Sequence, residues 1–266
     1  MASICNADDP AAYERSMGRW SRLLAVPFLD FAALAADTAS VLDVGCGTGS
    51  LAYAAAERLP GATVTGLDHS EAYVSHARSR AAELRLRFEQ GDAAALPYEV
   101  ASFEAALSLL VLNFVPDAQR AAREMARVTR SGGVVAAAVW DFHGGLTSLR
   151  VFLDTAAPLD EGASALRARQ FSAPFTGPGE FGAAWREMGL RDVAETSLTI
   201  RMEFASFDDY WGPWLGGQGT IGAYVCGLPE KRRALVERHT RLAYLAGGED
   251  WPRSFAATAW AVRGVV

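Results

Sequence analysis

Three glycines that alternate with single residues restrict the local fold more than any other stretch of the chain. An apolar run at residues 41–44 leads into Gly45, Gly47 and Gly49, and a helix-forming stretch at 50–57 follows. Glycine tolerates a positive φ and leaves no Cβ above the turn, so a ligand can approach the free N–H groups that open the helix. The pattern predicts a strand, a tight turn that a ligand covers, and a helix.

A second strand that ends on an acid follows this helix. Residues 62–68 read as a strand ending at Asp68, about 20 residues past the glycines, where an acid reaches a ribose diol in dinucleotide-type sites. Asp68 could instead cap the next helix, predicted over 71–84, together with Ser70. The order strand, helix, strand predicts a βαβ unit with parallel strands and a right-handed connection.

Three further strands are expected in the first half of the chain. They are predicted at 86–89, 103–110 and 134–139, with a helix from 117 to 128 and a glycine turn at 131–133 before the last of them. Strands that alternate with helices define a doubly wound α/β sheet, whose ligand crevice lies outside the carboxyl ends of the strands. The polar residues that follow the strands should therefore meet along one edge.

The N-terminal segment reads as an amphipathic helix. Four large apolar residues share one of its faces: Tyr13, Met17, Trp20 and Leu24. The spacing predicts that this helix ends near Pro27 and that a second helix covers 28–36. Two interpretations remain open, a helix that packs on the sheet with a solvated arginine face or a lid over the glycine turn.

Composition excludes several classes of protein. The chain has 266 residues, of which 50% are hydrophobic and 21% charged, so it can bury a core of ordinary size. A net charge of −6 and a single lysine, Lys231, argue against a nucleic-acid partner. No apolar run is long enough to span a membrane and no secretory signal is visible, so we expect a cytoplasmic protein. Its three cysteines lack metal-ligand spacing, and no metal is expected.

Four motifs occur in a recognised order on the expected elements. They are 41–49, 66–68, 91–93 and 127–139, and with their surroundings they span residues 13–141. This half of the chain resembles the class I methyltransferases that use S-adenosylmethionine, especially the small-molecule branch near the ubiquinone-biosynthesis methyltransferases. The resemblance implies a Rossmann-like, mostly parallel sheet of seven strands in the order 3-2-1-4-5-7-6, with the last strand antiparallel, helices on both faces and a helical cap.

The resemblance also implies a cofactor site and roles within it. The implied site comprises Tyr13, Arg19, Asp43, Gly45, Cys46, Gly47, Gly49, Asp68, His69, Asp92, Ala93, Ser108 and Leu109. Gly45 and Gly47 would flank the methionine part, Asp68 would hold the ribose, and Asp92 with Ala93 would read the adenine. The cofactor has no phosphate, and the turn lacks the Gly-x-Gly-x-x-Gly spacing of dehydrogenases.

Further roles follow by the same analogy. The backbone of Ser108 and Leu109 would lie near the amino group, Arg19 would bind the methionine carboxylate, and Tyr13 would lie near the methyl group. His69 is expected beside the adenine. Cys46 is expected to fill a small slot in the turn.

The second half of the chain is expected to build a cap and close the sheet. The predicted parts are a helical lid at 1–36, a cofactor-binding core at 37–141, cap insertions at 142–180 and 207–250, and closing strands within 181–206 and 251–266. Tyr210, Trp211 and Trp214 are candidates for an aromatic substrate cleft, although large aromatics at such positions also form ordinary core.

A sulfonium is an activated methyl donor, so the protein mainly aligns an acceptor and excludes water. An acceptor that must lose a proton would need a base, and the candidates are Asp141 and His143, with Asn113 able to orient the acceptor. We expect methyl transfer to a small, partly apolar molecule, with S-adenosylhomocysteine as product. Two alternatives remain, a non-methylating reaction in secondary metabolism and a sensor that only binds the cofactor.

Overall fold

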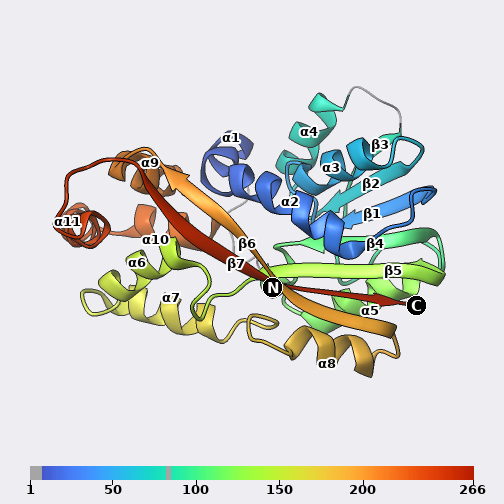
Figure 1. Cartoon of the computed structure of the whole chain (residues 1–266). Coiled ribbons are helices and arrows are strands. Elements are labelled where there is room, and N and C mark those ends of the chain that lie inside the picture. Colours follow the sequence, from blue (N-terminus) through green and yellow to red (C-terminus); the bar gives the residue numbers. More distant parts are fainter. Residues whose placement is uncertain (1–7, 82–84) are drawn as a thin grey trace.

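A seven-stranded sheet organises the computed structural model, which describes residues 8–81 and 85–266 (Figure 1). Its strand order is β3-β2-β1-β4-β5-β7-β6, and β7 runs antiparallel to both of its neighbours, whereas the first five strands in this order are parallel. The strands are β1 Ser40–Val44, β2 Thr63–Asp68, β3 Leu86–Gln90, β4 Phe103–Leu109, β5 Thr129–Trp140, β6 Arg191–Phe204 and β7 Arg253–Val265. The predicted topology is confirmed.

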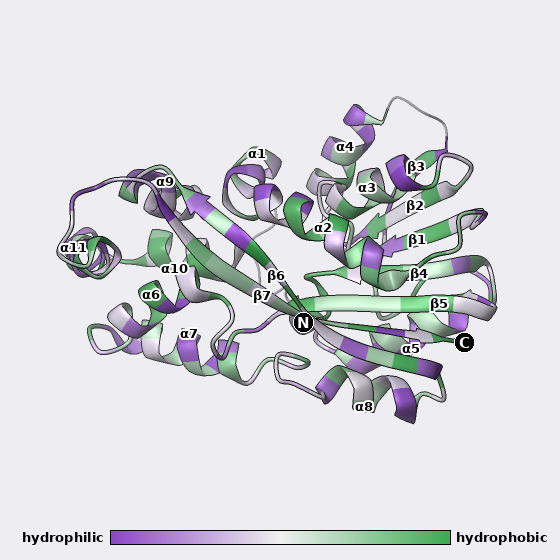
Figure 2. Cartoon of the chain, in the orientation of Figure 1, coloured by the Kyte–Doolittle hydropathy of each residue, from purple (hydrophilic) through white to green (hydrophobic). Residues whose placement is uncertain are grey.

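Helices cover both faces of the sheet, and two apolar cores result. Val41 belongs to the core under α2 (Arg19–Ala32), α3 (Ser50–Arg58) and α4 (Glu71–Arg80), whereas its neighbour Leu42 belongs to the core under α5 (Ala118–Val128) and α8 (Glu180–Glu187). Successive strand residues point to opposite faces, so a strand buried on both sides must be apolar throughout. The central strands β4 and β5 are accordingly mainly hydrophobic in colour along their buried length (Figure 2).

The N-terminal helices differ from the prediction. The chain forms α1 (Pro10–Tyr13), a π-helical turn η1 (Glu14–Gly18) and then α2, which continues through Pro27 to Ala32. Pro27 cannot donate to the carbonyl of Leu23, but Leu23 lies on the exposed face of the helix, while Phe28 continues the buried stripe. The predicted break at Pro27 and the separate helix over 28–36 are therefore wrong.

Two other boundaries differ from the prediction. The helix expected over 71–84 ends at Arg80, and its last predicted residues, 82–84, lie outside the described part of the chain. Strand β5 begins at Thr129, before the predicted start at residue 134. Gly132, with φ of 79°, allows an irregularity within the strand, and the register against β4 shifts there. The glycines at 132 and 133 therefore interrupt a strand and do not precede it.

The last two strands extend beyond the rest of the sheet and carry the cap. Pairing between β5 and β7 ends at Trp140 and Ala259, whereas β6 and β7 remain paired as far as Phe204 and Arg253. Helices from two insertions gather around this extension (Figure 1). They are α6 Thr147–Ala156, α7 Glu161–Phe171, α9 Phe207–Trp211, η3 Gly212–Gly216, α10 Gly219–Gly227 and α11 Glu230–Leu245. The hairpin thus joins the sheet to the cap.

Candidate active site

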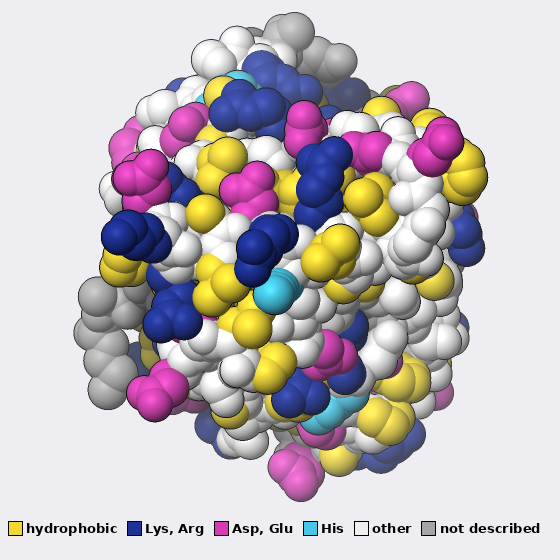
Figure 3. Space-filling view, turned by 90° about the vertical axis from the view of Figure 1, so that its left-hand side faces the viewer, with side chains coloured by type: hydrophobic (Ala, Val, Ile, Leu, Met, Phe, Trp, Pro, Cys, Tyr) yellow, Lys and Arg dark blue, Asp and Glu magenta, His cyan; other side chains and the backbone are white. Residues whose placement is uncertain are grey.

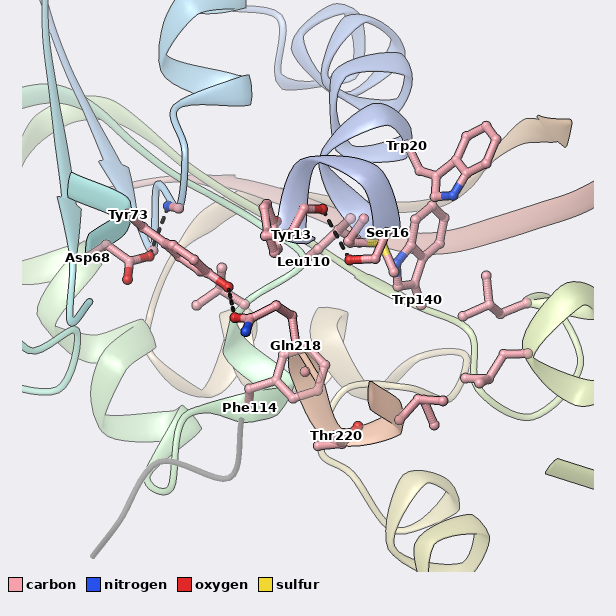
Figure 4. Close-up of a pocket in the computed structure, with 18 of the residues that line it drawn as sticks. Tyr13, Ser16, Trp20, Asp68, Tyr73, Leu110, Phe114, Trp140, Gln218 and Thr220 are labelled. Carbon is pink, nitrogen blue, oxygen red and sulfur yellow. Dashed lines mark hydrogen bonds between the residues drawn. The ribbon is translucent and has the colours of Figure 1, made fainter. Parts of the chain in front are cut away.

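One cavity of about 450 Å³ runs from the glycine turn to the cap. Gly45, Gly47, Asp68, Asp92 and Ala93 line its end at the carboxyl edge of β1, β2 and β3. The other end lies between the sheet, the N-terminal helices and the cap (Figure 4). A cavity of this size and place suits a small ligand at the switch point of an α/β sheet.

The glycine turn has the geometry that its sequence predicted. Gly45 has φ of 76° and Gly47 of 53°, and the N–H of Gly45 donates to the carbonyl of Leu67 at 2.7 Å. A Cβ on Gly45 would lie 2.4 Å from Val111, whereas one on Gly47 would meet nothing closer than Tyr13 at 3.7 Å. Gly45 therefore allows Val111 to pack closely against the turn, while Gly47 leaves the cavity side of the turn open.

Asp68 is held in place by two backbone donors. Its Oδ2 accepts from the N–H of Gly47 at 2.8 Å and its Oδ1 from the N–H of Ser70 at 2.9 Å. The Ser70 hydroxyl, rather than Asp68, accepts from the N–H of Tyr73 and caps α4. A carboxylate has about four lone-pair sites, so the buried Asp68 keeps capacity to accept from a ligand's hydroxyl. Its hydrogen bond with His69 raises the pKa of that imidazole.

Asp43 lies close to the site but does not line the cavity. It is 1% exposed, and both of its side-chain oxygens are buried without a hydrogen-bond partner among the described residues. Burial, reinforced by the charge of Asp68, raises the pKa of Asp43 to about 8. Burial also raises the pKa of the neighbouring Cys46 thiol.

The N-terminal segment lies against the glycine turn and the cofactor end of the cavity. The Glu14 carboxylate accepts from the Thr48 hydroxyl, and the ring of Tyr13 lies 4.9 Å from that of Tyr73. Burial raises the pKa of Tyr13 to about 12. The Oε1 atom of Gln218, in the cap, accepts from the Tyr73 hydroxyl at 3.2 Å (Figure 4) and from the N–H of Asp9 at 3.2 Å. Three separate segments therefore meet over the cavity.

The cap end of the cavity is mainly aromatic and aliphatic. Its lining includes Trp20, Leu110, Phe114, Trp140, Phe142, Leu149, Met202, Phe204, Tyr210, Trp214 and Ile221. The Tyr210 hydroxyl donates to the carbonyl of Ser148 at 2.7 Å, and burial raises the pKa of that phenol well above its usual range. Trp211, predicted for the cleft, is not among the lining residues, because it stacks on Phe207 at 6.0 Å inside the cap core.

The predicted catalytic residues lie outside the cavity lining. Oδ1 of Asp141 accepts from the N–H groups of His143 and Gly144 at 2.8 and 3.1 Å, so it stabilises the turn after β5. His143 is exposed, and its ring lies 5.5 Å from Phe171. Asn113 is buried but does not line the cavity. Their proximity to the strand ends in the sequence suggested a place in the site, but none of the three lines the cavity, and their catalytic roles stay predictions.

Several predicted cofactor residues support the turn without lining the cavity. Cys46, Gly49, Ser108 and Leu109 are absent from its lining, and the Ser108 hydroxyl donates to the carbonyl of Val44 at 2.9 Å. Leu110 and Val111 line the cavity after β4 instead. Arg19 lines the cavity, but its Nη1 donates to Asp209 Oδ1 at 2.8 Å and its Nη2 to the Asp209 carbonyl at 3.2 Å. Both terminal nitrogens thus bind the cap in this structure, and the predicted contact of Arg19 with the methionine carboxylate stays a prediction.

Sequence reasoning missed Tyr73, Trp140 and Gln218. Trp140 ends the apolar fifth strand, so its position at the carboxyl edge was a usable signal. Gln218 stands between Gly217 and Gly219, both with positive φ, in a loop that no motif marked. Its part in the site arises only from tertiary contacts.

Comparison with known proteins is consistent with this geometry. Residues 41–133 match the methyltransferase domain family. An uncharacterised protein of Mycobacterium tuberculosis is 30% identical over 229 residues, which cover 84% of this chain and 81% of that protein. The chain belongs to the class I S-adenosylmethionine-dependent methyltransferases.

Two further comparisons describe this methyltransferase's relatives. Nocamycin O-methyltransferase of Saccharothrix syringae is 28% identical over 223 residues, covering 78% of this chain and 79% of that enzyme. A phosphoethanolamine N-methyltransferase of Haemonchus contortus, solved with S-adenosyl-L-methionine, has a TM-score of 0.60 at 15% identity, covering 96% of this chain and 56% of that one. This second likeness shows the shared fold.

The residues present fit S-adenosylmethionine, the cofactor of this methyltransferase. The open Gly47 face and the remaining acceptor capacity of Asp68 suit a ligand with a ribose diol and no phosphate. The described residues contain no group of three or more His, Cys, Asp or Glu side chains placed to hold a metal ion. No helix in the same residues is long and apolar enough to cross a bilayer.

Proposed function

We propose that this enzyme transfers a methyl group to a small, partly apolar molecule bound between the sheet and the cap. One observation carries the proposal: a single cavity connects Asp68 and the glycine turn with an aromatic wall formed by Trp140 and Trp214. A cofactor held at one end would therefore share one enclosed space with an acceptor held at the other. Bound S-adenosylmethionine supplies an activated methyl group, and the chain supplies binding, orientation and shielding from water.

Cofactor binding is assigned to three strand ends. Asp68 would hold the ribose diol, Asp92 and Ala93 would contact the adenine, and Gly45 and Gly47 would flank the methionine part. Asp92 supports this assignment because its Oδ1 accepts from the N–H of Ala94 at 2.8 Å and thereby fixes the loop after β3. Asp43, which does not line the cavity, would act indirectly, from within the strand that leads into the turn.

Residues 8–18 are assigned the role of a lid, attached to α2, which packs in the core. The contacts of Glu14 with Thr48 and of Tyr13 with Tyr73 attach the π-helical turn to the cofactor end, and Gln218 attaches residues 8 and 9 to the cap. These contacts are polar or few, so they can break and re-form when a ligand enters.

Basic and acidic side chains are interspersed on the face in Figure 3, which suits a small-molecule acceptor better than a polyanion.

Isothermal titration calorimetry and a transfer assay test the proposal. We expect S-adenosylmethionine and S-adenosylhomocysteine to bind and NAD not to bind. Incubation with methyl-labelled cofactor and a panel of aromatic acids, phenols and amines should label at least one acceptor. Binding of the cofactor without transfer to any acceptor would favour the sensor alternative, and binding of NAD in place of the sulfonium would contradict the proposal.

A further inference from the structure

The cap end of the cavity contains a buried hydrogen-bond donor without a partner. Trp140 is 3% exposed and lines the cavity, and its indole Nε1–H finds no acceptor among the described residues. Figure 4 shows the indole nitrogen on the edge of the ring that is turned toward the Ser16 side of the cavity. Leaving a donor buried and unpaired costs about 1–3 kcal/mol. A ligand that accepts this hydrogen bond would recover that energy.

A second unpartnered donor belongs to the same wall. Nε of Arg19 is buried without an acceptor, although the terminal nitrogens of the guanidinium bind Asp209. The guanidinium carbon lies 4.3 Å from the centroid of the Trp20 ring and 5.1 Å from that of Phe204, both of which line the cavity. Of the buried side-chain atoms without a partner that the structure describes, these two belong to cavity-lining residues, and both are donors.

The described lining also offers no proton acceptor for the reacting atom at this end. Asp68, His69 and Asp92 lie at the ends of β2 and β3, on the cofactor side. The Tyr210 hydroxyl is committed to the carbonyl of Ser148, and Asp141 and His143 do not line the cavity. An acceptor that is protonated at neutral pH would find no carboxylate or imidazole among the described lining residues of this end to take its proton.

We propose that the methyl acceptor is an apolar, ring-bearing molecule with an oxygen that is already ionised at neutral pH, a carboxylate or an acidic enol, which Trp140 Nε1–H binds. This assignment rests on the proposed function and adds the class of acceptor. Aromatic side chains from Phe114, Phe204 and Trp214 line this end and would bury the ring, while the unpartnered Trp140 donor would bind the negative oxygen. An ammonium group would meet the Trp140 donor and no carboxylate among the described lining residues of this end, only neutral acceptors such as Gln170 and Thr220, which disfavours amines.

The chemistry of this acceptor balances without a base. A lone pair of the ionised oxygen forms the C–O bond to the methyl carbon while the C–S bond breaks, and the bonding electron pair passes to sulfur, which becomes a neutral thioether. No proton is transferred. Trp140 is a positioning residue for the oxygen and does not act as an acid or a base in this step.

Binding of three matched probes tests the class of acceptor. The protein saturated with S-adenosylhomocysteine is titrated with 2-naphthoate, 2-naphthamide and 2-naphthylmethylammonium, which share one ring system and differ in charge. We expect 2-naphthoate to bind at least about tenfold more tightly than the ammonium probe. Equal or tighter binding of the ammonium, or failure of all three probes to bind, would overturn the assignment.

Two variants isolate the indole donor. Trp140→Phe keeps an aromatic ring and removes the N–H, so it should raise the Kd of 2-naphthoate about tenfold and leave that of S-adenosylhomocysteine within about twofold. Trp260→Phe is the matched control, because Trp260 Nε1 is also buried and unpartnered but the residue packs in the other core and does not line the cavity. It should change neither affinity.

Nuclear magnetic resonance gives a direct readout of the same contact. The indole ¹⁵N–¹H signal of Trp140, assigned by its loss in Trp140→Phe, should shift when 2-naphthoate binds, while that of Trp260 should not. An unshifted Trp140 signal, or unchanged 2-naphthoate affinity in Trp140→Phe, would overturn the role of the indole. Failure of the parent protein to bind S-adenosylhomocysteine would instead contradict the proposed function.

Discussion

The ribose-binding role of Asp68 can be tested by removing its charge with little change of shape. Asp68→Asn keeps one carbonyl oxygen but replaces the other with an NH₂ group, and in the structure both oxygens accept backbone N–H groups, those of Gly47 and Ser70. One of these two backbone N–H groups would then face the new NH₂ group, so that two donors would meet without an acceptor. The variant therefore loses a charged acceptor for the cofactor's diol and part of the support of the glycine turn.

The expected magnitude follows from these contacts. Hydrogen bonds to a charged group contribute about 1.5–3 kcal/mol, and Asp68 is 6% exposed, so solvent screens it little. We expect Asp68→Asn to weaken binding of S-adenosylhomocysteine by about 2 kcal/mol, or about thirtyfold in Kd. Asp92 is exposed, so Asp92→Asn should cost less than Asp68→Asn.

Calorimetry with S-adenosylhomocysteine measures both affinities, and thermal unfolding without ligand reports damage to the turn. Asp117→Ala is a control for a lost helix cap, because Asp117 accepts from the N–H of Arg120 at the start of α5 and does not line the cavity. It should lower stability and leave cofactor affinity unchanged. If both Asp68→Asn and Asp92→Asn bind the cofactor product like the parent, the placement of ribose and adenine is wrong.

Three further predictions concern Asp43, the lid and Arg19. Burial raises the pKa of Asp43 to about 8, so the folded state holds the proton of this carboxyl more tightly than the unfolded chain does. The resulting contribution to the free energy of unfolding is complete below about pH 4 and is lost as the pH rises through about 8. Between about pH 5 and 7, urea unfolding should show the parent losing about 1.4 kcal/mol per pH unit relative to Asp43→Asn, and parallel curves would refute this. S-adenosylhomocysteine should slow amide hydrogen exchange across Tyr13–Leu24, as a lid requires, and unchanged exchange there would mean that the helix only packs on the sheet. Arg19→Ala should leave cofactor affinity nearly unchanged, since Asp209 holds both terminal guanidinium nitrogens, and a large loss would restore the carboxylate role.

Local sequence determined the cofactor end of the site. The glycine turn requires backbone angles that glycine adopts readily, as Gly45 and Gly47 show with φ of 76° and 53°. Asp68 ends a strand buried on both faces, so its position at the carboxyl edge follows from strand periodicity alone. These features depend on residues close in the chain, which is why motif order was sufficient to predict the strand topology and the cofactor.

Residue order near the strand ends did not determine side-chain direction. Asp141 and His143 directly follow β5, yet the turn after the strand directs the carboxylate of Asp141 to backbone N–H groups and leaves His143 exposed. Trp211 and Trp214 lie three residues apart, but only Trp214 lines the cavity. A turn of helix separates the two, and which one faces the ligand depends on how the cap packs against the sheet.

Tertiary structure alone decided the acceptor end. Its wall combines Trp20 from the N-terminal helix, Trp140 from β5, Phe204 from β6 and Gln218 from the cap, residues that no local pattern connects. The extension of β6 and β7 beyond Trp140 brings these segments together. The sequence by itself therefore determined the fold and the cofactor, because both depend on local backbone geometry and strand order. The packing of distant segments decided which side chains line the cap end of the cavity and left the Trp140 donor there without a partner among the described residues.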